Sequence, residues 1–438
     1  MPTKKSSVKP TSRTAIKPSN NLVQQLKANP KTASVIVALF ILFALVIVIF
    51  ARAAGTRKSV ALTFNNPTNA NGTVSRQGDG SYAFANATSS SNCNPTRNRF
   101  TIVGNQIIDP SCKVFTPMGA NIAISPGYVF NWKGVANGRV NEVKGWGWNM
   151  IRTNLTCLNA NGTNDLNGML SGLDSVVQEY TAQKIVVMIE CHDYTGANRA
   201  DGSALYPFLD AVTTKYANNP YVWFNPVNEP VQGSDTAALN TWTTLQTAML
   251  NRVRAKAPHN IYVADIPGYG QAIDPVINGT SVTSLGSGKC NVMYSWHNYG
   301  AGSPNYNTNN AESTSFAYQQ SAFEALRTKK IPLLVGEIGD PLTLNEGTAG
   351  SPQWNRWGAY ATMQYAPQNG VGILWWHATG DSGVFLTYSL MADRNVPLWS
   401  ALPNGTGLSV GGQKFWALTH TAPSALPFSG DINQSNCN

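Results

Sequence analysis

Two glutamates in this sequence occupy positions where paired carboxyl groups could do chemistry. Glu229 lies in an Asn-Glu-Pro triplet after an aromatic and apolar run that begins at Tyr221, and Glu337 ends the apolar run Leu333–Gly336. Runs of this kind are typical of strands buried on both faces. A glutamate that leaves such a strand is partly removed from water, which raises its pKa toward the range of a general acid. Taken alone, Glu229 could equally cap the next segment.

Carboxyl groups that flank a bond are what the hydrolysis of a glycosidic bond needs. One must be protonated to donate to the leaving oxygen, and the other must be ionised to attack the anomeric carbon. An ionised Glu337 would need compensation, which Arg152 and Tyr299 could supply as a charge and a hydrogen bond. Glu229 would then keep its proton near neutral pH, and it could act as the base once Glu337 has become esterified.

Eight strand-like runs could position these residues: Val114–Asn121, Asn149–Leu155, Ile185–Cys191, Val222–Asn228, Ile261–Ile266, Val292–His297, Pro332–Glu337 and Gly372–His377. Amphipathic stretches lie between most of them, at Leu170–Gln183, Leu205–Tyr216, Ala237–Ala257, Ser315–Lys329 and Trp354–Gln364. A short hairpin, Phe100–Val103 with Gln106–Ile108, leads into this region. The alternation predicts an α/β fold, a (β/α)₈ TIM barrel. An open doubly wound sheet is disfavoured because no Gly-x-Gly-x-x-Gly turn follows the first strand.

Polar side chains follow the ends of the predicted strands, where the active site of such a barrel lies. Any one of them could be a helix cap or a loop residue, but their recurrence on all eight strands favours a site. They are Asn121, Arg152, Asn154, Glu190, His192, Asp193, Asn228, Glu229, Asp265, His297, Asn298, Tyr299, Glu337 and Trp375–His377.

This ordered set resembles glycoside hydrolase family 5, the cellulase family of retaining β-glycanases, over roughly residues 98–425. Asn-Glu-Pro or Gly-Glu alone would be weak evidence, whereas the whole set on successive strands is specific. The matching residues are Arg152, His192, Asn228, Glu229, Pro230, His297, Tyr299, Gly336, Glu337 and Trp376.

The resemblance implies a role for each matching position. Glu229 would be the catalytic acid and base, and Glu337 the nucleophile. The substrate-binding residues would be Asn228 at the sugar 2-hydroxyl, Arg152 and Tyr299 at the nucleophile, His192 and His297 around the reactive subsite, and Trp376 as the platform of that sugar. Trp375 is expected to pack in the core, because adjacent strand residues face opposite ways.

Two segments, Glu190–Gly196 and Asp265–Gln271, are most similar to those of bacterial endo-β-1,4-mannanases. Pro230 departs from that pattern, since mannanases often carry Trp there and cellulases commonly carry Pro. The sequence therefore predicts a polysaccharide hydrolase that acts on mannan, with an endo-β-1,4-glucanase as the alternative. A transglycosylase with the same residues also stays open.

A different class, a catalytically silent polysaccharide-binding barrel, would be marked by the loss of one glutamate, and both are present. We expect no cofactor and no metal, because His192 and Asp193 lack the ligand spacing of zinc sites. We expect a monomer.

The charge of +9 belongs to the N-terminal region. Residues 1–52 hold eight of the 31 Lys and Arg and no acid, which leaves 23 bases against 22 acids. A near-neutral main domain does not indicate nucleic-acid binding. Charged residues make up 12% of the chain, against ~25% in an average globular protein, which suits neutral, hydroxyl-rich ligands.

We predict that the first 97 residues form three segments, which are followed by a hydrolase domain at 98–430. Residues 1–32 are polar and basic and are expected to be a disordered cytoplasmic leader. Residues 33–52 include the uncharged run Ala33–Ala51, long enough for a membrane anchor. The positive charges before this run place the rest of the chain outside the cytoplasm. A cleaved signal peptide is the alternative. Residues 53–97 could be a linker or a small β-element.

Six cysteines would then lie outside the reducing cytosol, where disulfides persist. None stands in a Cys-x-x-Cys pair. Six cysteines can pair in many ways, and we predict Cys93–Cys112 and Cys157–Cys191 from their proximity in the chain or in the barrel.

Overall fold

The computed structural model describes residues 74–76, 82–84, 98–123, 138–158, 166–300, 312–340, 352–378, 389–392, 407–421 and 425–427. The chain divides into two units, Met1–Thr63 and Phe64–Asn438, and all described residues belong to the second. The predicted leader (1–32) and anchor or signal segment (33–52) lie outside them, so both stay predictions. Among the described residues, no helix has the length and apolar character needed to cross a membrane.

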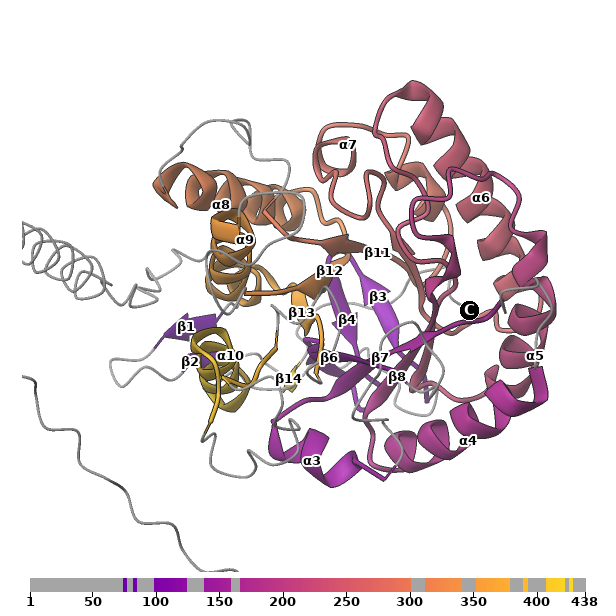
Figure 1. Cartoon of the computed structure of the whole chain (residues 1–438), viewed down its shortest axis with the longest axis horizontal. Coiled ribbons are helices and arrows are strands. Elements are labelled where there is room, and N and C mark those ends of the chain that lie inside the picture. Colours follow the sequence, from indigo (N-terminus) through magenta and orange to yellow (C-terminus); the bar gives the residue numbers. More distant parts are fainter. Residues whose placement is uncertain are drawn as a thin grey trace, which may run out of the picture. The chain divides into compact units, whose positions relative to one another are not determined.

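Eight parallel strands form a closed barrel, as predicted (Figure 1). Each strand pairs with the next along the chain, and the last pairs with the first. In order they are β6 (Met118–Ala123), β7 (Met150–Leu155), β8 (Val186–Cys191), β9 (Val222–Asn225), β10 (Tyr262–Asp265), β11 (Val292–His297), β12 (Leu333–Ile338) and β13 (Gly372–Trp375).

Helices follow most of the strands and pack on the outside of the barrel (Figure 1). They are α3 (Val140–Gly145), α4 (Leu166–Ala182), α5 (Tyr206–Tyr216), α6 (Thr236–Arg254), α7 (Asp274–Ile277), α8 (Glu312–Thr328), α9 (Pro352–Tyr365) and α10 (Val410–Thr421). The side chain of Asp235 caps α6 by accepting a hydrogen bond from the N–H of Ala238. The predicted amphipathic stretches correspond to α4, α5, α6, α8 and α9, which present apolar stripes to the sheet.

The first predicted strand, Val114–Asn121, is wrong as a single element. The structure has two strands there, β5 (Lys113–Phe115) and the barrel strand β6, with Pro117 between them. Proline has no N–H to donate to a sheet ladder, so it separates the two pairings. Its carbonyl instead accepts a hydrogen bond from the N–H of Ile373 at 2.8 Å, at the start of β13.

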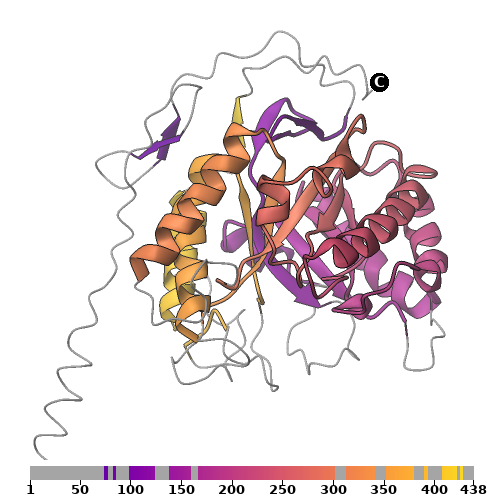
Figure 2. The same cartoon turned by 90° about the horizontal axis from the view of Figure 1, so that it is seen from above.

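A small antiparallel sheet closes one end of the barrel (Figure 2). It contains the predicted hairpin, now β3 (Thr101–Val103) and β4 (Gln106–Ile108), followed by β5 and β14 (Ala425–Pro427). The rings of Phe100 and Phe115 contact Trp223 edge-on, with centroids 5.3 and 6.0 Å apart. This cluster also includes apolar residues from the starts of the barrel strands, so the hairpin seals the end at which the strands begin.

Two further strands, β1 (Val74–Arg76) and β2 (Tyr82–Phe84), pair antiparallel within the segment predicted as a linker or small β-element. The predicted Cys157–Cys191 disulfide is present and joins the segment after β7 to the end of β8. Cys112 and Cys290 are also disulfide-bonded. The predicted Cys93–Cys112 pair lies partly outside the described residues, because Cys93 does.

Candidate active site

Arg152 is the centre of the polar network at the carboxyl end of the barrel. Its side chain on β7 is fully buried. Burial would lower the pKa of its guanidinium, but the surrounding carboxylates of Glu190, Asp265 and Glu337 raise it, so the group stays charged. It donates hydrogen bonds at 2.6–3.1 Å to Glu337, Asn121, Asn225, Asn228 and Asp265.

Glu337 is held by a donor at each oxygen. Arg152 Nη1 donates to Oε1 at 2.6 Å, and the Tyr299 hydroxyl donates to Oε2 at 2.8 Å. The residue is only 3% exposed. The residue before it is a glycine, and a Cβ at Gly336 would lie 2.2 Å from Ser295 Oγ, so a larger residue there would displace the Ser295 side chain. The two donors, one of them charged, hold the carboxyl group in one fixed orientation.

Glu229 lies beyond its strand rather than at its end, which corrects the predicted strand Val222–Asn228. Strand β9 stops at Asn225, before Pro226, and Glu229 follows in a loop with φ +40°. That loop is fixed from both sides. The N–H of Glu229 donates to Asp265 Oδ2 at 3.2 Å, and its carbonyl accepts from the N–H of Gly196 at 2.8 Å. The left-handed backbone is therefore imposed by the surroundings.

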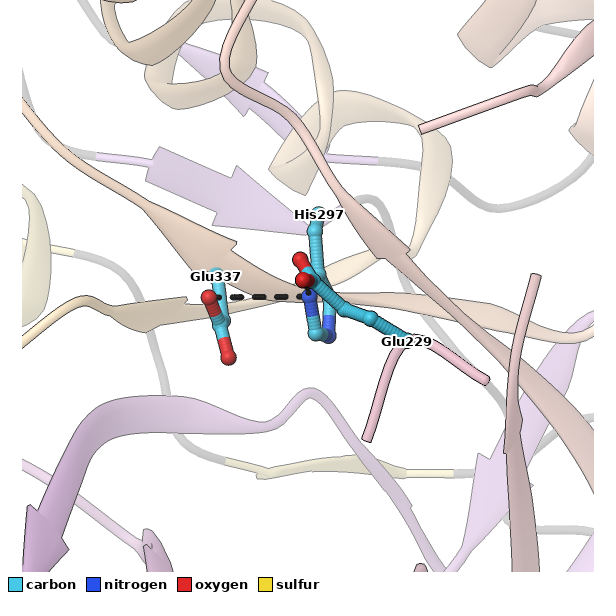
Figure 3. Close-up of side chains that lie close together, drawn as sticks. All are labelled: Glu229, His297 and Glu337. Carbon is cyan, nitrogen blue, oxygen red and sulfur yellow. Dashed lines mark hydrogen bonds and ion pairs between the residues drawn. The ribbon is translucent and has the colours of Figure 1, made fainter. Parts of the chain in front are cut away.

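His297 lies between the two glutamates (Figure 3). Its Nδ1 is 2.8 Å from Glu229 Oε1 and 3.5 Å from Glu337 Oε2, while Nε2 is 3.2 Å from Asp265 Oδ2. One ligand-type atom from each of Glu229, His297 and Glu337 falls within 4.8 Å of the others. The backbone of His297 is also fixed, since its N–H donates to the Gly270 carbonyl at 2.7 Å.

The charges in this group bias the carboxyl groups differently. Burial would lower the pKa of His297, but Glu337 and Asp265 raise it to about 10, so the ring is protonated at neutral pH. Burial raises the pKa of Asp265, but His297 and Arg152 outweigh it and hold that pKa far below its usual range. Burial raises the pKa of Glu229; His297 opposes this and Glu337 adds to it, and the net direction is upward. Glu229 is thus biased toward the protonated form of a general acid.

The predicted sugar contacts gather beside these carboxyl groups. The rings of His192 and Trp376 stack with centroids 5.2 Å apart and an angle of 16°. His192 Nδ1 is 3.1 Å from Glu190 Oε1. Asn228 accepts from Arg152, donates to Thr195 Oγ1 at 2.8 Å and reaches within 3.4 Å of His192 Nε2. All the predicted site residues therefore lie in one region of the barrel mouth.

Trp375 packs in the core, as expected. Its side chain is fully buried and lies against Phe415 of α10, with ring centroids 5.4 Å apart.

Three buried residues of this network were given no role from the sequence, although Glu190 and Asp265 were among the polar residues predicted at the strand ends. Asp265 bridges Arg152, His297 and the Glu229 N–H, and Asn225 and Glu190 complete the hydrogen bonds around Arg152 and His192. Asp265 could have been found from its place in the Asp-x-x-Gly-x-Gly-Gln segment. Asn225 carries no such signal, since it reads as part of a buried strand.

The group Glu229, His297 and Glu337 offers three ligand atoms that could surround a metal ion. Two features oppose a resident cation there. Arg152 already neutralises Glu337 at 2.6 Å, and His297 carries a proton that a metal would have to displace.

Solved structures with the same barrel include mannanases and an endoglucanase. The catalytic domain of a mannanase from Streptomyces sp. SirexAA-E superposes with a TM-score of 0.56 at 21% identity, over 78% of this chain and 97% of that one. A mannotriose complex of the Thermomonospora fusca β-mannanase gives 0.55 at 19%, over 75% and 98%. A Thermobifida fusca endoglucanase catalytic domain with cellotetraose gives 0.52 at 16%, over 75% and 100%. At these identities the likeness establishes the fold.

The family follows from the sequence. Residues 116–382 match the family model described as cellulase (glycosyl hydrolase family 5), and the chain belongs to that family. Two curated relatives are mannan endo-1,4-β-mannosidases. The Streptomyces lividans protein is 23% identical over 284 residues, and the Cellvibrio japonicus protein is 25% identical over 306 residues. Each match covers 64% of this chain and 65% of the relative, so the chain spans about two thirds of their length.

Proposed function

We propose that this protein is a retaining endo-β-1,4-glycanase that hydrolyses mannan with Glu229 and Glu337. The observation that carries the proposal is the spacing of these two carboxyl groups, whose nearest oxygens lie within 4.8 Å of each other. Retaining glycosidases hold their carboxyl groups about 5–5.5 Å apart, whereas inverting enzymes leave about 6.5–9.5 Å for a water molecule. The geometry supports direct attack by one carboxylate on the sugar.

In the first step Glu337 attacks the anomeric carbon, and the bond to the leaving oxygen breaks. Arg152 and Tyr299 hold Glu337 by one hydrogen bond to each of its oxygens. Glu229 gives its proton to the leaving oxygen. His297 donates to Glu229 Oε1, which leaves the other oxygen to carry that proton. Trp376 and His192, stacked on each other, provide an apolar surface for the reacting sugar.

In the second step water attacks the glycosyl ester and Glu229 takes its proton. Esterification removes the negative charge of Glu337, which is one of the causes that raise the pKa of Glu229. The acid of the first step is therefore a stronger acid in the intermediate and ionises, which makes it the base of the second step. Asn228, fixed by Arg152 and Thr195, is placed to bind the 2-hydroxyl of the sugar.

Mannan is favoured over β-1,4-glucan as the substrate. Both curated relatives are named mannan endo-1,4-β-mannosidase. The segment from Asp265 to Gln271, which is similar to that of mannanases, supplies Asp265 and Gly270 to the hydrogen bonds around Glu229 and His297. An endoglucanase with the same fold is among the solved structures, and it makes β-1,4-glucan the second candidate.

We also propose that the hydrolase domain works outside the cytoplasm, tethered by the segment at residues 33–52, and acts as a monomer. The Cys157–Cys191 disulfide supports an oxidising compartment.

Reducing-sugar release by residues 55–438 from glucomannan, galactomannan, carboxymethyl cellulose, barley β-glucan and xylan tests this function. Release from the two mannans is the expected result. Release from cellulose and β-glucan alone would replace the substrate but keep the mechanism. No release by folded protein would contradict hydrolysis and favour a binding-only barrel. Proton NMR of the first product should show the β-anomer, and the α-anomer would contradict a retaining mechanism.

A further inference from the structure

Asn298 is a buried residue between two residues of the candidate active site. It follows His297, which ends β11, and precedes Tyr299, which donates a hydrogen bond to Glu337. It is fully buried, and no step of the proposed reaction uses it. An amide that is removed from water costs free energy unless it is hydrogen-bonded. The partners of this amide therefore indicate what it holds in place.

The Asn298 amide makes all four of the hydrogen bonds open to it. Its Nδ2 donates to Gln319 Oε1 on α8 at 2.6 Å and to Thr362 Oγ1 on α9 at 2.7 Å. Its Oδ1 accepts from Gln319 Nε2 at 3.1 Å and from the N–H of Gly300 at 3.2 Å. Two donors and two acceptor positions are the full capacity of an amide side chain. Asn298 thus joins two helices outside the barrel to the loop after β11.

Helix α9 approaches the same loop closely through a glycine. A Cβ at Gly358 would lie 2.6 Å from the Gly300 nitrogen and 3.1 Å from the Asn298 carbonyl oxygen. Both are backbone atoms, so a larger residue at this position would force the helix and the loop apart. Helices α8 and α9 pack against each other on this side of the barrel (Figure 1). The loop is therefore supported by two packed helices.

The backbone of the loop is also tied to the strand that carries the nucleophile. The N–H of Asn298 donates to the Glu337 carbonyl at 2.8 Å. Tyr299 consequently lies between two residues whose positions are fixed, Asn298 and Gly300. Its hydroxyl is 2.8 Å from Glu337 Oε2. A movement of the loop by about 1 Å would lengthen this contact beyond the range of a normal hydrogen bond.

We propose that Asn298 is a positioning residue for the nucleophile, acting through Tyr299. This inference rests on the proposed function and deepens it, because it makes the orientation of Glu337 depend on helices α8 and α9. Arg152 holds one oxygen of Glu337 from within the barrel. Asn298 secures the donor at the other oxygen from outside the barrel. Together the two supports keep the attacking carboxylate in one orientation.

A double-mutant cycle in the whole chain tests whether Asn298 acts through Tyr299. Asn298→Ala should lower kcat/KM for mannopentaose by about tenfold through kcat, with KM changed by less than about twofold, because the orientation of Glu337 matters during attack. Tyr299→Phe removes the hydroxyl that Asn298 positions. In the Tyr299→Phe protein, Asn298→Ala should therefore lower kcat/KM by no more than about twofold further. A purely structural role predicts instead that the two losses multiply.

Thr362→Val keeps the test available if Asn298→Ala does not fold. Valine has nearly the shape of threonine and removes only the hydroxyl that accepts from Asn298 Nδ2. It should lower kcat/KM by about threefold, and Thr362→Ser, which restores a hydroxyl, should recover most of this loss. In the Tyr299→Phe protein, Thr362→Val should leave kcat/KM unchanged.

Tyr262→Phe is the matched control. Tyr262 on β10 donates to Gln246 Oε1 on α6 at 2.6 Å, so it too makes a buried hydrogen bond that reaches an outer helix. It lies at the start of its strand, away from the mouth. Thermal denaturation should show lower stability in both Tyr262→Phe and Asn298→Ala. Measured well below both transitions, kcat/KM should fall only in Asn298→Ala. An equal fall in both proteins would overturn the proposal, because stability alone would account for it.

Losses that multiply in the double variant, or an unchanged kcat/KM in folded Asn298→Ala, would overturn the role of Asn298 and leave the proposed function intact. A wild-type protein that cleaves neither mannan nor β-1,4-glucan would instead contradict the proposed function. If the polysaccharide panel identifies β-1,4-glucan, cellopentaose takes the place of mannopentaose.

Discussion

The two ends of the barrel are built by the same strands, yet their interiors have opposite chemistry. On β9, the indole of Trp223 packs in the apolar base cluster, and two residues later Asn225 belongs to the polar network around Arg152. Strand β10 repeats the change with Val263 and Asp265. Since residues two apart on a strand share a face, the interior switches from apolar to charged within one step along the barrel axis.

Because of this difference, the residues that stabilise the fold lie at one end of the barrel and the candidate active-site residues lie at the other. The base consists of apolar side chains such as Phe100 and Trp223, whose burial stabilises the fold. The mouth holds buried charges, which are expensive to desolvate and are retained only because each is paired, as Arg152 is with Glu337 and Asp265. Changes at the mouth should therefore cost activity, and changes at the base should cost stability.

The largest effect is expected from Glu337→Gln at the mouth. The amide cannot form the glycosyl ester, so kcat on mannan should fall by roughly 10⁴-fold or more. Polysaccharide binding, measured by affinity electrophoresis, should persist. Normal turnover in this variant would remove Glu337 from the role of nucleophile.

Glu229→Ala should follow, with a loss on polysaccharide of about 10²–10⁴-fold, the contribution of a positioned general acid. A dinitrophenyl glycoside needs little protonation of its leaving group, so its first step should be slowed far less. Burst kinetics on this substrate measure that step directly. Comparable losses on both substrates would argue against Glu229 as the acid.

At the base, Trp223→Ala should reduce the free energy of unfolding by about 3–5 kcal/mol, because it leaves a cavity among Phe100, Phe115 and the strand starts. Thermal denaturation measures this loss, and Trp223→Phe should show a smaller one. The kcat of the remaining folded protein, measured well below the transition, should match the wild-type value. A loss of kcat without a change in stability would contradict the expectation that changes at the base cost stability rather than activity.

The smallest effect is expected from His297→Gln, which should shift the pH dependence of kcat/KM. The His297 hydrogen bond and charge lower the pKa of Glu229, and glutamine carries no charge, so the substitution should raise that pKa further. An acid with a higher pKa stays protonated to higher pH, and the alkaline limb of kcat/KM should therefore move to higher pH. A pH–rate profile of the two proteins checks the direction, and a shift to lower pH would contradict this arrangement of charges.

The barrel and the polar residues at its mouth could be predicted from the sequence, because apolar strand runs and the polar residues after them are local signals. The sequence places Glu229 at the end of a strand. In the structure, strand β9 ends before Pro226, and Glu229 lies in the following loop, held by hydrogen bonds to Asp265 and Gly196. Those partners are 36 and 33 residues away along the chain, and only the closed ring of strands brings them together. Asp265 and Asn225 are likewise distant from their partner Arg152, which lies 113 and 73 residues away along the chain.

The hairpin that seals the base also decides how molecules enter the barrel. Phe100 and Trp223 fill the interior at that end, so among the described residues the mouth is where solvent reaches Glu337. In the proposed reaction, the water that resolves the glycosyl ester must come in by the route through which the first product goes out. Departure of that product then precedes hydrolysis, and slow release of the product would lengthen the life of the intermediate. A segment that never touches substrate thereby sets the order of exit and entry.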